Sequence, residues 1–257
     1  MASRNPVLIR ATGETLGQGQ TTQTTSAPAG FGTSALMTMD DVIVKTGILF
    51  VVLVAGAFFG WNTAEANPSV LVIGAVVGLV LGLVNSFKRN VSPALVLAYG
   101  VAEGVFLGGI SKVFDIAYAE QAPQIVSQAV IGTLTTFGVM LALYRTNIIK
   151  VNGKFMKIFS IAMVSYLVIA LASFISSFFN VGNGWGFYGV GQIGLLLCAL
   201  GVALAAFSLV MDFELIAQGV RSGLPEKESW RMAFGLTVTL VWLYTEILRL
   251  LAILSDR

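Results

Sequence analysis

Seven long apolar runs constrain the fold of this chain more than any other feature. They cover residues 42–60, 69–86, 93–114, 123–144, 158–179, 187–211 and 232–254. A helix needs about 20 residues to cross a hydrocarbon core of about 30 Å, and each run has that length or nearly so. Because backbone groups in lipid must be hydrogen-bonded within the protein, we expect helices. The pattern predicts an all-α membrane protein, a bundle of seven transmembrane helices in residues 39–257.

The composition supports an integral membrane protein and excludes several classes of function. Of all residues, 56% are hydrophobic and 11% are charged, whereas soluble domains have about 25% charged residues. The net charge of +2 is too small to indicate a nucleic-acid partner. There is no histidine, and the one cysteine, Cys198, lies in an apolar run, so histidine metal sites, multi-cysteine metal sites and an intramolecular disulfide are excluded. We expect no cofactor, and a proton sensor in this chain has to be a carboxyl group.

Residues 1–38 are rich in Ser, Thr, Gly, Gln and Ala and have no apolar period, which predicts a disordered tail. They lack the basic-then-apolar order of a signal peptide. Twelve of the fifteen Lys and Arg residues fall in the tail and at alternate connections on its side. The positive-inside rule therefore predicts a cytoplasmic tail and an outer C-terminus. We expect a multi-pass protein of the plasma (inner) membrane, whose main partner is the lipid bilayer.

Glycine recurs at every fourth residue in the second and third runs. The positions are Gly74, Gly78 and Gly82 in the second run and Gly100, Gly104 and Gly108 in the third. Such a stripe leaves a groove through which two helices can approach closely. We expect these two spans to pack against each other or against a neighbouring helix.

Three acidic residues within or at the edge of the apolar runs are the candidate functional groups. Glu103 lies about ten residues into the third run, which places it about 15 Å deep, near the bilayer midplane. Asp212 closes the sixth run at its cytoplasmic boundary, and Glu246 lies in the last run, three residues before Arg249. Charged groups within spanning helices usually face the protein interior or a water-filled cavity. We expect the three carboxyl groups to converge on one aqueous or cationic spot, with Arg249 as the counter-charge.

Helical spacing puts a polar and small stripe on one face of the last run: Gly235, Thr239, Trp242, Glu246 and Arg249. Two interpretations of its charges remain open. Glu246 and Arg249 can neutralise each other and act as interhelical glue, or the carboxyl groups can bind protons or hard cations such as calcium. The same choice applies to the other two acids. Glu103 can be a protonated group that is hydrogen-bonded within the bundle, and Asp212 can be a solvated helix end.

The last forty residues contain DFELIAQG from Asp212, a turn with Gly223 and Pro225, and AFGLTVTLVWLYTEILRLL. The third span reads SPALVLAYGVAEGVFLGGIS. These segments resemble the Bax inhibitor-1 family, the transmembrane Bax inhibitor motif proteins, and within it a bacterial branch. The resemblance covers residues 42–254. It implies a bundle in which six helices surround the last one, and a proton-sensitive calcium leak gated by two aspartates between the sixth and seventh helices.

Carried over to this chain, Asp212 matches the aspartate of the sixth helix. An ungapped match of the last helix, fixed on Arg249, puts Thr239 at the place of the second aspartate. Thr239 cannot ionise, and Glu246 lies about 10 Å further along the helix, so it is a poor direct substitute. The resemblance thus implies a two-aspartate switch with one part missing.

The leading hypothesis is a pH-sensitive cation leak channel, with calcium as the cation. Glu103, Asp212 and Glu246 are its proton- or cation-binding groups. The alternative is a non-conducting membrane interaction protein that modulates a membrane protease or a stress response. We do not expect an enzyme, because the chain has no histidine for a serine–histidine pair and no GxSxG or HExxH motif.

Overall fold

The computed structural model describes residues 35–149, 151–184, 186–189 and 191–255. Their long helices are α2 (Met39–Thr63), α3 (Ser69–Phe87), α4 (Pro93–Ala117), α5 (Ile125–Arg145), α6 (Gly153–Ser177), α7 (Gly191–Arg221) and α8 (Ser229–Ser255). Short 3-10 helices in the connections are η1 (Val181–Gly184), η2 (Gly186–Gly189) and η3 (Glu226–Glu228). Seven helices among the described residues are long and apolar enough to cross a membrane, which confirms the predicted all-α bundle.

Helix α7 differs most from the run expected for it, residues 187–211. It begins at Gly191, after η2, and continues to Arg221. Buried side chains recur at helical spacing well beyond Asp212, so the segment has a face to pack against its neighbours. The helix ends just before Gly223, which adopts a left-handed conformation with φ of 66°. Asp212, expected at the end of this span, therefore lies well inside the helix.

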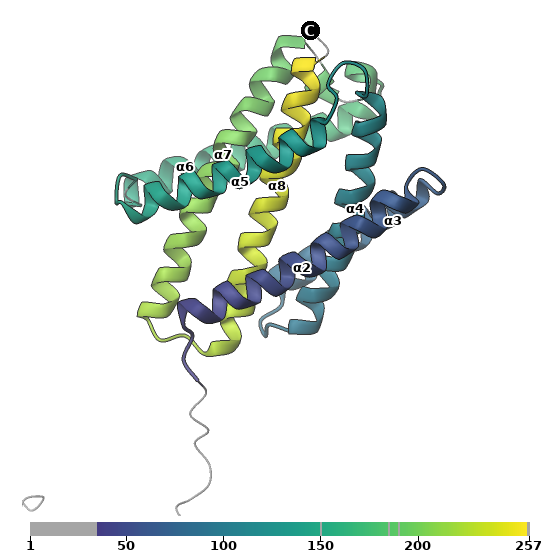
Figure 1. Cartoon of the computed structure of the whole chain (residues 1–257). Coiled ribbons are helices and arrows are strands. Elements are labelled where there is room, and N and C mark those ends of the chain that lie inside the picture. Colours follow the sequence, from purple (N-terminus) through teal and green to yellow (C-terminus); the bar gives the residue numbers. More distant parts are fainter. Residues whose placement is uncertain (1–34, 150, 185, 190, 256–257) are drawn as a thin grey trace, which may run out of the picture. The chain divides into compact units, whose positions relative to one another are not determined.

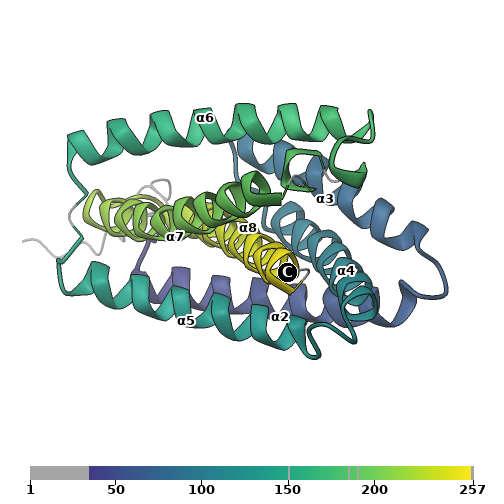
Figure 2. The ribbon, with the colours of Figure 1, turned by 90° about the horizontal axis from the view of Figure 1, so that it is seen from above.

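Helix α8 lies at the centre of the bundle, as expected (Figure 2). It packs against α7, α2, α5 and α4. In the most apolar stretch of each helix, 56% of the residues are buried for α8 and 11% for α6, so α6 lies at the periphery. Helix α3 packs mainly on α4. The helices around α8 are thus unequal: four pack closely against it, while α3 and α6 form an outer part of the bundle.

Helices α2 and α4 approach each other closely at glycines that both helices contribute. A Cβ atom at Gly104 would overlap the carbonyl oxygen of Leu53 on α2, and one at Gly60 would overlap that of Val105 on α4. In the other stripe, a Cβ atom at Gly74 would lie 2.9 Å from the backbone nitrogen of Phe106. The expectation that both glycine stripes mediate close packing is confirmed. The stripe of α4 faces α2, and that of α3 faces a different side of α4.

Residues 35–38, here called the N-terminal strap, are held against the connection between α7 and α8 (Figure 1). The backbone nitrogen of Met37 donates to the carbonyl oxygen of Leu224 at 2.7 Å, and the nitrogen of Glu226 donates to that of Ala35 at 2.7 Å. Met37 is buried, with 2% of its surface exposed. The Nζ atom of Lys45 on α2 lies 2.9 Å from a carboxylate oxygen of Glu226. The rest of the predicted tail, residues 1–34, lies outside the described residues.

The connections that carry many basic residues meet at one end of the bundle, here called the basic end. The guanidinium of Arg231, in the first turn of α8, donates to the carbonyl oxygens of Lys88 and Arg89 after α3. The strap and the connection from α7 to α8 lie at this end too. The opposite end holds η1, η2 and the last turn of α8.

Candidate functional site

Asp212 of α7 faces Thr239 of α8, between the two helices. Their side chains lie close enough to interact. Thr239 is 8% exposed. The Oδ2 atom of Asp212 is also buried, and no described residue offers it a hydrogen bond. The two positions that the family resemblance pairs across the sixth and seventh helices therefore meet, with one carboxyl group where the resemblance implies two.

Glu246 lies about two turns further along α8 and is 4% exposed. Its Oε1 atom accepts hydrogen bonds from the hydroxyl of Tyr166 at 2.7 Å, the indole nitrogen of Trp242 at 3.2 Å and Nη1 of Arg249 at 3.4 Å. Its Oε2 atom is buried without a hydrogen-bond partner among the described residues. Three donors thus gather on one oxygen of this carboxyl group, and none on the other.

The buried oxygen of Glu246 lies against the backbone of α7. A Cβ atom at Gly201 would lie 2.9 Å from Oε2 and 2.8 Å from Cδ of Glu246, and it would overlap the hydroxyl of Tyr166. Only glycine leaves room here for both side chains. The carboxyl group of Glu246 is therefore fixed by donors on α6 and α8 and by the closely packed backbone of α7.

Tyr188 of η2 connects this cluster to the end of the bundle opposite the basic end. Its hydroxyl donates to the hydroxyl of Tyr166 at 2.7 Å, and its ring lies 4.5 Å from the guanidinium carbon of Arg249. Burial raises the pKa of Tyr188 above its ordinary value, so its hydroxyl remains a donor at neutral pH. Sequence reasoning missed both tyrosines. For Tyr166, the available signal was a hydroxyl in the middle of an apolar span, which needs a partner when buried.

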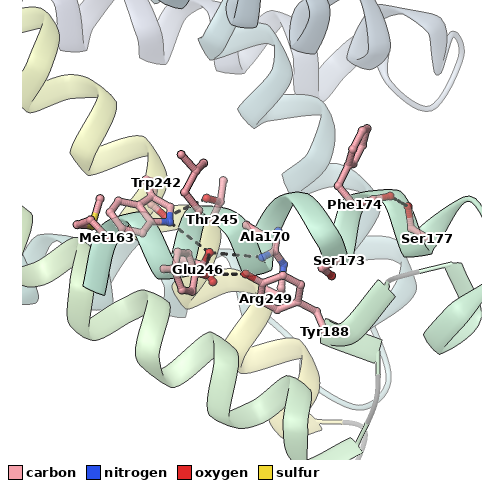
Figure 3. A pocket seen from close by; sticks show the side chains of 12 residues that line it. Met163, Ala170, Ser173, Phe174, Ser177, Tyr188, Trp242, Thr245, Glu246 and Arg249 are labelled. Atoms are coloured by element: carbon pink, nitrogen blue, oxygen red, sulfur yellow. Dashed lines mark hydrogen bonds and ion pairs between the residues drawn. The ribbon is translucent and has the colours of Figure 1, made fainter. Parts of the chain in front are cut away.

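A cavity of about 530 Å³ lies between α6 and α8, beside the Glu246 cluster (Figure 3). One part of its lining is polar, from Tyr188, Glu246 and Arg249, and another part is apolar, from Met163, Phe174 and Trp242. Figure 3 shows the side chains of Trp242, Glu246 and Arg249 coming together from α8, with Tyr188 beside Arg249. In the polar stripe expected on α8, Thr239 thus faces α7, Trp242 contacts α6, and Glu246 contacts both helices.

Glu103 lies on α4, apart from both of these carboxyl groups. It is half-buried and faces α3, where a Cβ atom at Gly78 would lie 2.5 Å from its Oε2 atom. It makes no hydrogen bond or ion pair with any other described residue. The expectation that all three carboxyl groups converge on one spot is therefore wrong. Asp212 and Glu246 lie along the interface of α7 and α8, about 10 Å apart in helical rise, while Glu103 faces another helix.

The carboxyl groups of this site can bind either protons or cations that prefer oxygen ligands. Within the described ranges, no cluster of three or more His, Cys, Asp or Glu residues could hold a metal ion. Each of the carboxyl groups at the α7–α8 interface has one oxygen that lacks a hydrogen-bond partner in the described part of the chain. A proton can occupy such an oxygen, and so can a cation that arrives with part of its water shell.

A comparison with known protein families identifies the family of this chain. A family model described as Bax inhibitor 1 like matches residues 5–256, nearly the whole chain. This match extends on both sides beyond residues 42–254, the range that the resemblance in the sequence covers. A comparison with curated proteins returned no match. The chain is therefore a multi-pass membrane protein that belongs to the Bax inhibitor 1 like family.

Proposed function

We propose that this protein is a pH-sensitive cation leak channel of the plasma membrane, with calcium as the cation. The observation that supports it best is the carboxyl group of Asp212, which faces Thr239 inside the bundle with a buried oxygen that has no hydrogen-bond partner in the described residues. Such a group is costly unless it binds a proton or a cation. The basic end of the bundle is cytoplasmic in this proposal, following the positive-inside rule.

In this proposal the cation moves along the interface of α7 and α8. Asp212 is the binding group nearer the basic end, and Glu246 is the one nearer the opposite end. Carboxylate oxygens suit hard cations such as calcium. Arg249 is the counter-charge that keeps the second carboxylate from trapping the ion, since binding must stay weak enough for release. Glu103 remains a proton- or cation-binding candidate on α4, outside this path. The leak needs no cofactor and no catalysis.

The pH sensitivity follows from the charge of Asp212. When its carboxyl group is protonated, it is neutral and offers a cation little attraction; when it is ionised, it attracts cations. Thr239 has no proton to exchange near neutral pH, so a single carboxyl group acts at this place. We therefore expect the flux to rise with pH as a single titrating group predicts. Two coupled carboxyl groups would give a different, steeper dependence on pH.

Calcium uptake into vesicles that contain the purified protein tests the proposal, measured with an enclosed dye over a pH series. Flux should exceed that of empty vesicles and should rise with pH. Asp212→Asn should weaken the pH dependence, whereas Glu120→Gln, at an exposed acid before α5, should leave it unchanged. Flux equal to that of empty vesicles at every pH would exclude a leak channel.

One observation favours the alternative of a non-conducting interaction protein. Three donors and the backbone of α7 enclose Glu246, which suits a carboxyl group that ties helices together. Under this alternative the partner is a membrane protease or a stress-response protein. Co-purification with such a protein, together with the absence of any flux, would favour it over the leak.

A further inference from the structure

Two tyrosine hydroxyls form a continuous hydrogen-bonded link between η2, outside the spanning helices, and the buried carboxyl group of Glu246. The hydroxyl of Tyr188 donates to that of Tyr166, and the hydroxyl of Tyr166 donates to Oε1 of Glu246, each at 2.7 Å. Both protons point toward the carboxyl group. The three side chains come from η2, α6 and α8, so the link joins separate elements of the bundle.

The surroundings of Glu246 leave two routes for a proton: the cavity between α6 and α8, which Glu246 helps to line, and the two tyrosine hydroxyls. The titratable or charged groups that interact with it are Tyr166 on α6, Tyr188 on η2, Cys198 on α7 and Arg249 on its own helix. Oε2 is closed off by the backbone at Gly201. The side chain is 5% exposed, and its other oxygen already receives three donors. A proton that reaches this carboxyl group therefore has to replace one of those donors or come through it.

We propose that Glu246 is a second proton-binding site, separate from Asp212, and that Tyr188 and Tyr166 carry protons to it from the end of the bundle opposite the basic end. The transfer is a relay. The hydroxyl proton of Tyr166 passes to Glu246, the proton of Tyr188 replaces it on Tyr166, and a proton from water replaces that on Tyr188. The net change is one proton taken from water and one carboxylate made neutral.

This inference deepens the proposed function, since it adds a pH response from the second side of the membrane. Neutral Glu246 no longer forms an ion pair with Arg249, whose guanidinium keeps its contact with the ring of Tyr188. The charge that a cation meets at this depth then changes from a neutral pair to a free guanidinium, which repels cations. Acid on the side of η2 should therefore reduce the leak independently of Asp212.

Infrared difference spectroscopy of the full-length protein in lipid nanodiscs tests the relay. The carbonyl band of the protonated carboxyl group of Glu246 is the one lost in Glu246→Gln. After transfer into D₂O, its exchange rate is followed at low pH. Tyr188→Phe removes the outer hydroxyl of the relay, but it keeps the ring beside Arg249 and the bond from Tyr166 to Glu246. Because the relay then has no outer donor, exchange should slow about tenfold or more. Tyr166→Phe should also slow it.

The matched control is Tyr244→Phe, which removes a half-buried hydroxyl elsewhere on α8 that is hydrogen-bonded to Ser111 of α4. It should leave the exchange rate unchanged. Unaltered exchange in Tyr188→Phe, with a thermal unfolding curve like that of the wild type, would overturn the relay. The absence of any band dependent on Glu246 across the pH range would overturn the proton site itself.

The infrared readout needs no ion flux, so the two proposals can fail separately. If exchange depends on Tyr188 but the vesicles show no flux, the relay stands and the leak does not. If flux depends on pH through Asp212 but Tyr188→Phe leaves exchange unchanged, the leak stands and the relay does not.

Discussion

The carboxyl group of Glu246 lies directly against the backbone of Gly201, so a methyl group at residue 201 would lie 2.8 Å from Cδ of Glu246. Gly201→Ala should therefore push apart α7 and α8 or displace the hydroxyl of Tyr166. We expect a loss of about 1–3 kcal/mol of stability, seen as a lower melting temperature in detergent. Gly138→Ala is the control, because a Cβ atom there meets nothing within 4 Å. It should be neutral or slightly stabilising in its helix. Equal melting temperatures for both variants would contradict this packing.

The close approach of α2 and α4 gives a second prediction. A methyl group at Gly108 would overlap the carbonyl oxygen of Ala57 on α2, and backbone cannot move aside as a side chain can. Gly108→Ala should cost about 1–3 kcal/mol or more and should lower the yield of folded protein in size-exclusion chromatography. Gly47→Ala on α2, where a Cβ atom has open space, should behave like the wild type. A monodisperse Gly108→Ala protein of unchanged stability would count against the packing of α2 on α4.

Hydropathy predicted the seven spanning helices, and the family resemblance predicted the central place of the last one. Runs of about 20 apolar residues suit spanning helices and exceed the roughly 10 residues of a barrel strand, so the number of runs gave the number of helices. The end of α7 was misplaced, since Asp212 looks like a boundary residue when charge is read without its neighbours. The apolar residues after it show that the helix continues to Arg221, and only the left-handed Gly223 ends it.

The candidate site was less predictable, because it depends on which helix each residue faces. Periodicity placed Thr239 and Glu246 on one face of α8, and this was correct. No pattern within α4 could reveal that Glu103 faces α3 rather than α8, since any side of a helix can face a neighbour. Tyr166 and Tyr188 lie far from Glu246 in sequence, and only the packing of α6 and η2 brings them together.

Thr239→Asp should restore the pair of carboxyl groups that the family resemblance implies. The new carboxyl group would lie beside that of Asp212, and two carboxyl groups so close cannot both ionise readily, so they share protons. We expect calcium flux in vesicles to become more steeply dependent on pH than in the wild type. Thr239→Asn has a similar shape without the charge and should keep the shallow response. The same pH profile in Thr239→Asp and Thr239→Asn would show that this position does not face the path.

Lys45 should stabilise the strap and the start of α8. Its Nζ atom lies 2.9 Å from the carboxylate of Glu226 and 2.7 Å from the hydroxyl of Ser229. Because 47% of the Glu226 side chain is exposed, solvent screens the ion pair, and we expect Lys45→Met to cost about 1 kcal/mol. Limited proteolysis near residues 35–38 should become faster. Lys154→Met, at an exposed position, should leave the cleavage rate unchanged. Equal cleavage rates in both variants would mean that the strap is held without Lys45.

The strap and the central position of α8 impose an order on the assembly of this protein during synthesis. Lys45 and Glu226 are 181 residues apart, so at about 5–20 residues per second a ribosome makes the second of them roughly 9–36 s after the first. During that time the helices that pack on α8 lack this partner. Helix α8 leaves the ribosome after the four helices that pack on it, and its arrival lets the strap dock.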